Sequence, residues 1–437
     1  MRLISARRAV TGALTALTAL AMLSTGLLVA APAQAANRVT PGSFTGYAFD
    51  ARCTPTQSEM DQWLATSPFL GVGVYIGGAE RACAEPVPTR TWVNRQSRRG
   101  WKVLPIWVGP QASCTGYATR IDPSPARDYS DARAQGMVQA GQAARTADRL
   151  GIPKGSTLWY DLEDFDPGHS DDCRRSALSF LSAWTIRLHR LGFESGVYSN
   201  VAAAIHALDF ADTVSPGSYV MPDQVWYAWA NGRADTWIPR KWVRSESWSP
   251  GGRVHQYELD TEATYGGVTL RIDRNYLDVG RGSVAPTAAP SCGVRIDFDR
   301  YRRLARGATG AQVKAAQCLL KRKRVYDGRV HGRYDRATLR AVRSFQRTRD
   351  LRVTGRITTP TWTVLLTDGA SPVLKHGSAS DAVRRLQRGL NAAVRADQRV
   401  TGLFTARTTR AVIRYQRLNG LPRTGVVADD TWASLQH

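Results

Sequence analysis

The sequence predicts an α/β fold, an irregular TIM-like (β/α) barrel, followed by two all-α three-helix bundles. Two observations predict the barrel: short apolar runs recur up to residue 258, and helix-like stretches separate several of them. A third observation, a tandem repeat without gaps in residues 292–437, predicts the two bundles. The composition is that of globular domains, since 43% of the 437 residues are hydrophobic and 22% are charged.

Seven short apolar runs in the N-terminal part have the composition of buried strands. They cover residues 44–50, 71–76, 103–108, 157–163, 195–199, 225–230 and 254–258. Residues 127–150 and 171–191 carry apolar side chains at intervals of three and four, which predicts helices. Alternating strands and helices favour a parallel sheet, and seven or eight such units favour a barrel. Beyond Ser199 the helical patterns are short or absent, so we expect the barrel to be irregular.

The C-terminal repeat places each position n of the first copy against position n+70 of the second. Matched pairs include Leu304 with Leu374, Gln317 with Gln387, Gly332 with Gly402, Gln346 with Gln416, and Trp362 with Trp432. Apolar residues at helical spacing are separated by turn glycines, so each copy is predicted to form three short helices. The tryptophan of each copy is predicted to be a core anchor rather than a ligand contact.

Residues 283–291 are small, uncharged and proline-bearing, which is the composition of a linker. We therefore expect a barrel over residues 36–282, a first repeat over residues 292–369 and a second repeat over residues 370–437.

The first 35 residues have the features of a secretory signal peptide. Arg2, Arg7 and Arg8 form a basic start, residues 9–31 carry no charge, and Ala33-Gln34-Ala35 predicts cleavage after Ala35. A retained membrane anchor and a twin-arginine signal are the alternatives. We expect an exported protein with no stable membrane insertion after cleavage.

The cysteine content agrees with export, because an even number of cysteines in a secreted protein favours disulfides. The six are Cys53, Cys83, Cys114, Cys173, Cys292 and Cys318. They allow 15 connectivities, and pairing sequence neighbours predicts 53–83, 114–173 and 292–318. Only the last pair has a further argument, since both of its members lie beyond the linker. The sequence holds no Cys-x-x-Cys pair, which argues against zinc or redox chemistry.

The formal net charge of +23 is concentrated at one end of the chain. Residues 36–294 contain 26 basic and 26 acidic side chains, whereas residues 295–437 contain 30 basic and 10 acidic ones. A field of this kind attracts polyanions. The run at residues 321–324, Lys-Arg-Lys-Arg, suggests nucleic acid, but in an exported protein we expect a solvated basic face and no nucleic-acid partner.

The clearest candidate for a chemical site is the stretch around Asp161 and Glu163. Alternate residues of a strand point the same way, so these two carboxylates share a face with Trp159. A strand that ends in two carboxylates suits the carboxyl-terminal mouth of a barrel, where barrel enzymes keep their sites. Neighbouring carboxylates repel each other, so one is held protonated near neutral pH and provides a general acid.

Asp50 follows the same logic at the end of the first predicted strand. Gly46 and Ala48 share its face, while Tyr47 and Phe49 take the other. Small inward residues and a terminal acid suit a barrel strand whose end contributes to the same mouth.

In chain order these residues resemble the family 25 muramidases, and residues from about 40 to 282 resemble still more closely the glycoside-hydrolase-like domain of the mycobacterial Rv2525c type. The resemblance rests on Asp50 at the end of strand one, Asp161-x-Glu163 on strand four, Gly196-Val197-Tyr198-Ser199 on strand five, Gln256-Tyr257 on strand eight, and Ile272-Asp273-Arg274-Asn275 soon after. The first strand reads Tyr-Ala-Phe-Asp where the family 25 pattern has Gly-Ile-Asp.

The resemblance to family 25 implies cleavage between N-acetylmuramic acid and N-acetylglucosamine in peptidoglycan. It implies that Glu163 is the general acid and that Asp161 stabilises developing positive charge or orients the N-acetyl group. We count Asp50 with Asp161 and Glu163 among the candidate catalytic acids. The resemblance implies that Asp50 and Asp273 line the floor of the sugar-binding site. Substrate contacts are expected from Gln256 and Tyr198, and from two tryptophans near the mouth, Trp159 and Trp229.

Each C-terminal copy resembles the peptidoglycan-binding family 1 domain, through the order of its valine, glutamine, glycine, threonine and tryptophan positions. The resemblance implies peptidoglycan as a partner, and the basic charge adds anionic wall polymers. We expect a monomer that is associated with the cell wall.

Other interpretations remain open at this point. A calcium site could use Asp161, Glu163, Asp164 and Asp166, but no spaced calcium loop is present. The histidines show no paired spacing for zinc, so we expect no metal and no cofactor. The barrel could also be a glycan-binding domain without activity, or a hydrolase of a different envelope glycan.

Overall fold

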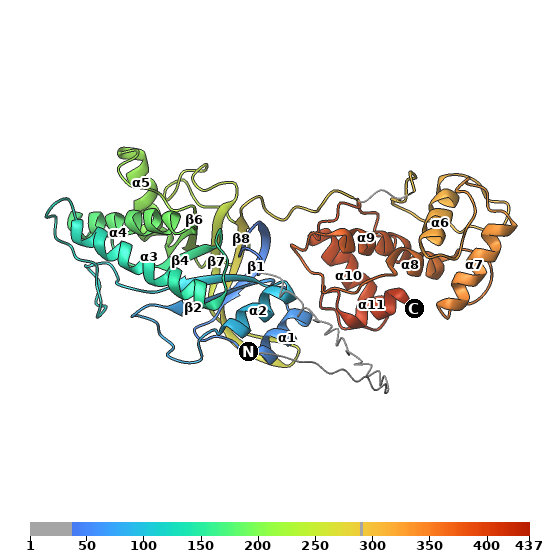
Figure 1. Cartoon of the computed structure of the whole chain (residues 1–437), viewed down its shortest axis with the longest axis horizontal. Helices are drawn as coiled ribbons and strands as arrows, with labels where there is room; N and C mark the ends of the chain where they lie inside the picture. Colours follow the sequence, from blue (N-terminus) through green and yellow to red (C-terminus); the bar gives the residue numbers. More distant parts are fainter. Residues whose placement is uncertain (1–36, 289–291) are drawn as a thin grey trace, which may run out of the picture. The chain divides into compact units, whose positions relative to one another are not determined.

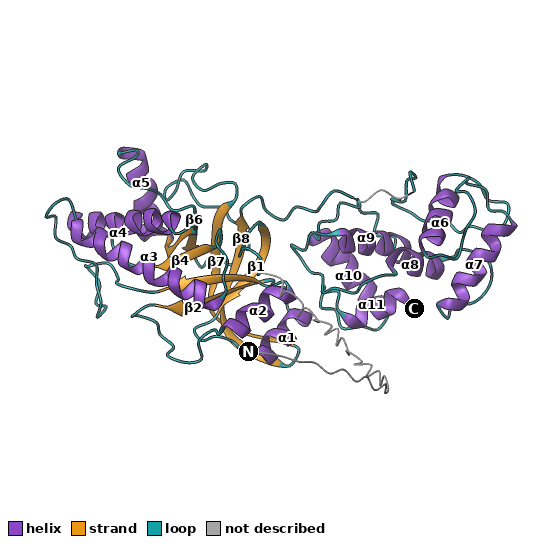
Figure 2. Ribbon diagram, viewed as in Figure 1, coloured by secondary structure: helices purple, strands orange, loops and turns teal. Residues whose placement is uncertain are grey.

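The structure, a computed structural model, describes residues 37–288 and 292–437. The predicted signal peptide and the last three residues of the predicted linker lie outside these ranges. Within the described N-terminal part, eight strands close a barrel in chain order (Figures 1 and 2). The strands are β1 (Phe44–Asp50), β2 (Gly71–Gly77), β3 (Lys102–Trp107), β4 (Thr157–Asp161), β5 (Glu194–Asn200), β6 (Gln224–Ala228), β7 (Gly252–Tyr265) and β8 (Val268–Val279).

The strand pairing confirms a barrel and shows how it is irregular. Neighbouring strands from β1 to β7 run parallel, whereas β8 runs antiparallel to both β7 and β1. Our series of strands ended at residue 258, so it missed β8 and most of the long hairpin that β7 and β8 form. Residues 272–275 lie on β8 itself, and Gln256 lies on β7 rather than on an eighth strand.

Helices surround the strands on the outside of the barrel (Figure 2). They are α1 (Gln57–Thr66), α2 (Arg90–Arg99), α3 (Ser130–Leu150), α4 (Asp171–Arg190), the π-helical turn η1 (Val201–Ile205) and α5 (His206–Val214). Helices α3 and α4 confirm the two long helical patterns. Between Ser199 and residue 282 the described chain holds only η1 and α5 as helical elements, as its weak periodicity predicted.

Side chains alternate between the inside and the outside of the barrel, as the period of two requires. Ala48, Trp159 and Trp226 belong to the apolar cluster that fills the interior. Phe49 and Tyr160 belong to the larger cluster between the strands and the surrounding helices. The alternation predicted for the first strand is therefore confirmed.

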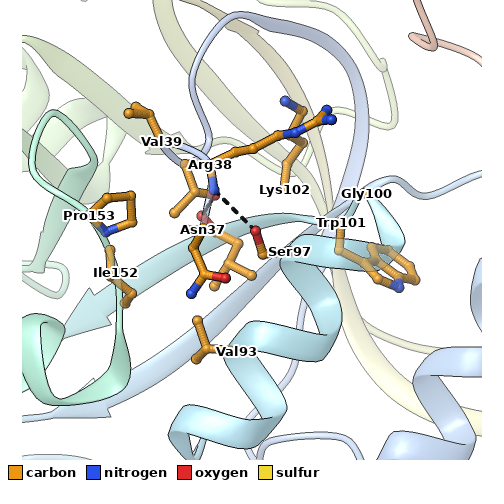
Figure 3. Close-up of a pocket in the computed structure, with 12 residues that line it drawn as sticks. Asn37, Arg38, Val39, Val93, Ser97, Gly100, Trp101, Lys102, Ile152 and Pro153 are labelled. Carbon is orange, nitrogen blue, oxygen red and sulfur yellow. Dashed lines mark hydrogen bonds between the residues drawn. The ribbon is translucent and has the colours of Figure 1, made fainter. Parts of the chain in front are cut away.

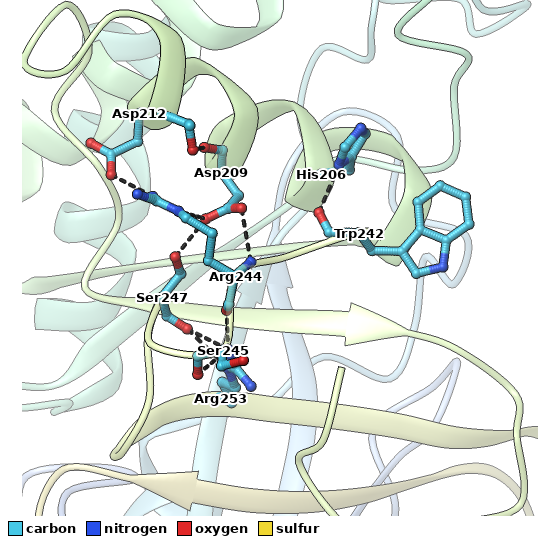
Figure 4. A network of polar contacts seen from close by, with 9 residues as sticks. His206, Asp209, Asp212, Trp242, Arg244, Ser245, Ser247 and Arg253 are labelled. Atoms are coloured by element: carbon cyan, nitrogen blue, oxygen red, sulfur yellow. Dashed lines mark hydrogen bonds and ion pairs between the residues drawn. The ribbon is translucent and has the colours of Figure 1, made fainter. Parts of the chain in front are cut away.

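A polar network replaces a covering helix between β6 and β7. The guanidinium of Arg244 donates to Asp209 of α5 (2.9 Å) and to Asp212 (2.7 Å). Arg253, at the start of β7, donates to the backbone carbonyls of Ser247 (2.7 Å) and Arg244 (2.9 Å) (Figure 4). Asp209 and Arg253 are both only 5% exposed, so their hydrogen bonds are shielded from water. These bonds hold the irregular loop between β6 and β7 in place, where no helix packs through an apolar face.

Each C-terminal copy forms three helices, and the second set repeats the first. The helices are α6 (Ala311–Arg322), α7 (Arg336–Thr348), α8 (Thr359–Thr367), α9 (Asp381–Ala393), α10 (Ala406–Leu418) and α11 (Asp429–Gln436). The tryptophans are core anchors as predicted: each is 1% exposed, and their indole N–H groups donate to the carbonyls of Arg302 (2.8 Å) and Pro372 (2.7 Å).

The three disulfides pair sequence neighbours as predicted. The bonds are Cys53–Cys83, Cys114–Cys173 and Cys292–Cys318. In the ranges that the structure describes, no helix has both the length and the apolar character needed to cross a membrane.

Candidate active site

Four carboxyl groups meet where the parallel strands of the barrel end. Asp50 is the last residue of β1, and Asp161 is the last residue of β4. Asp273 lies on β8 directly opposite Asp50. Glu163 lies in the loop after β4, since this strand ends at Asp161 and not at residue 163 as we predicted. The cluster nevertheless brings together all four acids that the sequence analysis selected.

Asp50 is held inside the barrel by amide side chains. It is 5% exposed, and it accepts hydrogen bonds from Asn275 Nδ2 (2.6 Å) and Gln256 Nε2 (3.3 Å). Gln256 in turn accepts a hydrogen bond from the hydroxyl of Tyr198 (2.9 Å). Tyr198 and Gln256, both predicted substrate contacts, therefore belong to a chain of hydrogen bonds that ends on Asp50.

The path of the chain from Asp161 to Glu163 is fixed by one buried glutamine. Gln111, in the loop after β3, donates to the backbone carbonyl of Asp161 (2.9 Å) and accepts from the backbone N–H of Glu163 (2.8 Å). Its side chain is fully buried. Gln111 thus spans the turn from which both carboxylates project, and no pattern in the sequence singled it out.

Burial and the charges of nearby carboxylates raise the pKa of every acid in the cluster. Burial, followed by the charge of Asp273, raises the pKa of Asp50 to about 8. The pKa of Asp161 is raised well above its usual range by burial and then by Glu163, against a hydrogen bond from Tyr75 that lowers it. The pKa of Glu163 is raised by burial and by the charges of Asp164 and Asp273.

This electrostatic arrangement favours proton retention at neutral pH. The charges that act most strongly on Asp50, Asp161 and Glu163 are those of other carboxylates. Coupled acids of this kind release their protons in steps that belong to the cluster as a whole. Glu163 is the least buried of the three.

Tyr75 is a member of the site that our sequence analysis missed. It lies near the end of β2, and the pKa of its hydroxyl is raised by burial and by Asp161, Asp50 and Glu163. The signal was present, because Gly71, Gly73 and Tyr75 repeat the pattern of small inward residues followed by a polar residue at the strand end. A side chain at Gly73 would come within 2.6 Å of Asp50 Cβ, which confirms that this face points inward.

An open cavity of about 800 Å³ lies beside the cluster. Asp50 and Asp273 form part of its wall, together with Arg52 and with Asp260 and Arg271 of the β7–β8 hairpin. Its size suits a ligand larger than a single sugar ring. A smaller pocket of about 30 Å³, lined by Asn37 and Lys102 among others, lies near the amino end of β3 (Figure 3).

The two predicted aromatic contacts differ in their exposure. Trp159 is fully buried in the barrel interior, where its ring packs edge-on against Trp226 at 5.6 Å. A buried ring offers no face to a sugar, so we do not keep Trp159 as a substrate contact. Trp229 is half-buried after β6, and its ring lies 5.9 Å from that of Trp237, which is 53% exposed.

In residues 37–288 and 292–437, no group of three or more histidine, cysteine, aspartate or glutamate side chains has an arrangement that could hold a metal ion. The acidic residues 164 and 166 are exposed. The geometry therefore gives no support to the calcium interpretation of this segment.

Comparison with known proteins identifies both parts of the chain. Residues 61–277 match the family described as "Rv2525c-like, glycoside hydrolase-like domain". Residues 309–365 and 379–435 each match the family described as "Putative peptidoglycan binding domain". A comparison with curated proteins gives no match.

Two solved structures are similar to the chain at low identity. An uncharacterized protein from B. stearothermophilus is 23% identical over 52% of this chain and 94% of its own length, with a TM-score of 0.33. A family 25 glycosyl hydrolase from Bacillus anthracis is 13% identical over 57% of this chain and 96% of its own, with a TM-score of 0.34. On the family matches, the barrel belongs to the Rv2525c-like glycoside hydrolase-like domains, and the two helical repeats belong to the peptidoglycan-binding domain family.

Proposed function

We propose that this protein is a secreted glycoside hydrolase of the muramidase type, which cleaves the glycan strands of peptidoglycan. The observation that carries this proposal is the cluster of Asp50, Asp161, Glu163 and Asp273 at the barrel mouth. Its members have raised pKa values, and a cavity lies beside them. A glycan-acting domain joined to peptidoglycan-binding domains supports the cell wall as the site of action.

Each acid has a distinct role in this proposal. Glu163, which is more accessible than Asp50 and Asp161, donates a proton to the glycosidic oxygen as the bond breaks, because its raised pKa favours the protonated form that a general acid needs. Asp161, two residues away, stabilises the positive charge that develops on the sugar or orients its N-acetyl group. Asp50 and Asp273 bind sugar hydroxyls at the floor of the site.

The remaining contacts position the substrate. Gln256 and Tyr198 orient Asp50, and Trp229 offers the partly exposed ring on which a sugar stacks. The two repeats hold the enzyme on its polymer, which raises the local substrate concentration. We further propose that the protein works outside the cell as a wall-associated monomer, binds anionic wall polymers and requires no cofactor.

The test compares the protein with Glu163→Gln on purified peptidoglycan, by loss of turbidity and by analysis of released fragments. The wild type should release fragments with new muramic-acid reducing ends, and Glu163→Gln should release at least 100-fold less, as expected for loss of a general acid. Glu246→Gln, a change at an exposed glutamate of the β6–β7 loop, is the matched control and should keep full activity.

A second function is favoured by one specific observation. The residues that line the 800 Å³ cavity include Asp50 and Asp273 but not Glu163. A glycan held there without cleavage would make the barrel a binding domain. If neither the wild type nor Glu163→Gln releases fragments while both sediment with the wall, this function, or hydrolysis of another envelope glycan, replaces the muramidase.

A further inference from the structure

Helix α7 of the first repeat carries a line of four arginines. Arg336, Arg340, Arg343 and Arg347 follow one another at intervals of four, three and four residues. With 3.6 residues per turn they fall within about 60° of the helix circumference, and they span about 16 Å along its axis. All four side chains are exposed, and the helix contains no acidic residue. We call this set the α7 arginine line.

The charge of this line is not neutralised within the described part of the chain. None of the four arginines forms an ion pair there, whereas Arg349, just beyond the helix, pairs with Asp368 (2.6 Å). Asp335 directly precedes the helix and caps it, because its carboxylate accepts a hydrogen bond from the backbone N–H of Thr338 (2.8 Å). The other carboxylate oxygen lies 3.3 Å from Nε2 of His331. The arginines are therefore available to an external anion.

The fold does not explain why these positions are arginine. The helix packs through the opposite face, where Thr338, Ala341, Val342, Phe345 and Gln346 are buried. Like charges at intervals of three and four residues destabilise a helix. The four arginines therefore take no part in the buried face of α7, and the repulsion between them destabilises the helix.

The second repeat shows that the fold tolerates other residues. At the equivalent positions α10 has Ala406, Arg410, Ile413 and Arg417, so it keeps two of the four arginines. Both repeats nevertheless form the same three helices with the same buried glutamines and tryptophans. The complete line belongs to the first repeat alone.

We propose that the α7 arginine line binds a linear phosphodiester polymer of the cell wall, of the poly(alditol phosphate) type. Guanidinium groups recognise phosphate oxygens through paired hydrogen bonds. A straight row of cations matches a chain that carries one negative charge in every repeat unit. The carboxylates of peptidoglycan, in contrast, sit on peptides that branch from the glycan strand. This inference rests on the wall location in the proposed function but not on hydrolysis by the barrel.

The experiment measures binding of purified poly(glycerol phosphate) to the full protein at several salt concentrations. Four phosphate contacts on a flexible chain contribute a slope of about 3 in log affinity against log salt, or roughly a 50-fold loss between 50 and 200 mM. Replacing all four residues with glutamine (Arg336→Gln, Arg340→Gln, Arg343→Gln and Arg347→Gln) should lower the slope by about that amount. Affinity at 50 mM salt should fall by at least 10-fold.

Two controls separate the line from net charge and from folding. The first replaces four other exposed arginines of the same repeat, Arg302, Arg303, Arg306 and Arg329, with glutamine. It removes the same charge and should change affinity by less than 3-fold. The second replaces the α7 arginines with lysine, which keeps the charge and should preserve most of the slope. The α7 glutamine variant should unfold on heating at the same temperature as the wild type or at a higher one.

Binding to peptidoglycan stripped of phosphate polymers distinguishes this inference from the proposed function. The α7 glutamine variant should still sediment with stripped peptidoglycan and should still act on it as the wild type does. The inference is overturned if the variant binds poly(glycerol phosphate) like the wild type, if the net-charge control weakens binding equally, or if binding to stripped peptidoglycan falls in parallel. It is also overturned if double-stranded DNA binds through the same arginines more tightly than the wall polymer.

Discussion

Asp50 and Asp273 face each other across the antiparallel pair that β1 and β8 form, so two carboxyl groups meet at one end of the barrel. The charge of Asp273 adds to burial in raising the pKa of Asp50 to about 8. A hydrogen bond from Asp50 lowers the pKa of Asp273 and so partly opposes its burial. The pair therefore retains a proton at neutral pH, held mainly by Asp50. A carboxyl group kept neutral in this way does not add a second negative charge beside Asp273.

The retained proton predicts a pH dependence of stability. The pKa of Asp50 in the folded protein is raised above its ordinary value of 3.8, so the folded state binds this proton more tightly than the unfolded state. The resulting stabilisation is complete below about pH 4 and is lost as the pH rises through about 8. Between pH 5 and pH 9 the wild type should lose roughly 4 kcal/mol more unfolding free energy than Asp50→Asn.

Denaturant unfolding at the two pH values measures this difference. Asp299→Asn, a change at an exposed aspartate of the first repeat, should follow the wild type. Equal losses of unfolding free energy in wild type and Asp50→Asn would show that Asp50 is ionised across this range.

Removal of the Tyr75 hydroxyl should shift the pH dependence of activity. This hydroxyl lowers the pKa of Asp161 by hydrogen bonding to its charged form. In Tyr75→Phe the pKa of Asp161 should rise further, so the acidic limb of the kcat profile should move to higher pH. At neutral pH kcat should fall roughly 10-fold or more, as ionised Asp161 becomes scarcer. Tyr219→Phe, on another part of the barrel, is the control and should leave the pH profile unchanged. If the acidic limb does not shift in Tyr75→Phe, the Tyr75 hydroxyl does not set the pKa of Asp161.

Gln111 is a positioning residue, and its replacement should affect kcat more than KM. Gln111→Met keeps the size of the side chain but removes the hydrogen bonds to Asp161 and Glu163. Small displacements of reacting groups cost up to about 100-fold in rate, so kcat should fall by roughly 10- to 100-fold. Gln96→Met removes another fully buried glutamine, on α2. Each of the two variants should lower the free energy of unfolding by about 1–3 kcal/mol, but Gln96→Met should leave kcat unchanged. Equal kcat values in the two variants would contradict the positioning role of Gln111.

The parts of the fold that the sequence predicts are those with a strong local period. The first strand was located with its correct bounds because small and aromatic residues alternate from Phe44 to Asp50. The repeat helices follow from a pattern that recurs with a constant offset, so that α7 begins at Arg336 and α10 at Ala406. Asp50, Asp161 and Glu163 could be selected because each ends a strand or follows one closely, whereas Asp273 was selected through the family resemblance.

The parts that were missed depend on contacts between distant segments. Strand β8 alternates apolar and polar residues from Val268 to Asp273, but Arg274 and Asn275 break the pattern. Its partner strand β1 is more than 200 residues away. Gln111 lies in an irregular loop, and only the folded chain brings it against Asp161. Trp159 was predicted to contact substrate as an aromatic residue near the mouth of the barrel. In the structure it packs in the apolar interior, and the inward face of β4 reaches the site only at Asp161.

The disulfide Cys114–Cys173 should matter for both stability and activity. It joins the loop after β3 to the first turn of α4, with a sequence separation of 59, and the enclosed segment contains Asp161 and Glu163. Replacing both cysteines with serine should lower the unfolding free energy by about 3–4 kcal/mol, the entropy of a loop of this length. Replacing Cys292 and Cys318, with a separation of 26, should cost a similar amount. Only the first change touches the loops around the acids, so only it should lower kcat under conditions where both variants are folded. Equal kcat in the two double variants would mean that the acids are held by Gln111 and the strands alone.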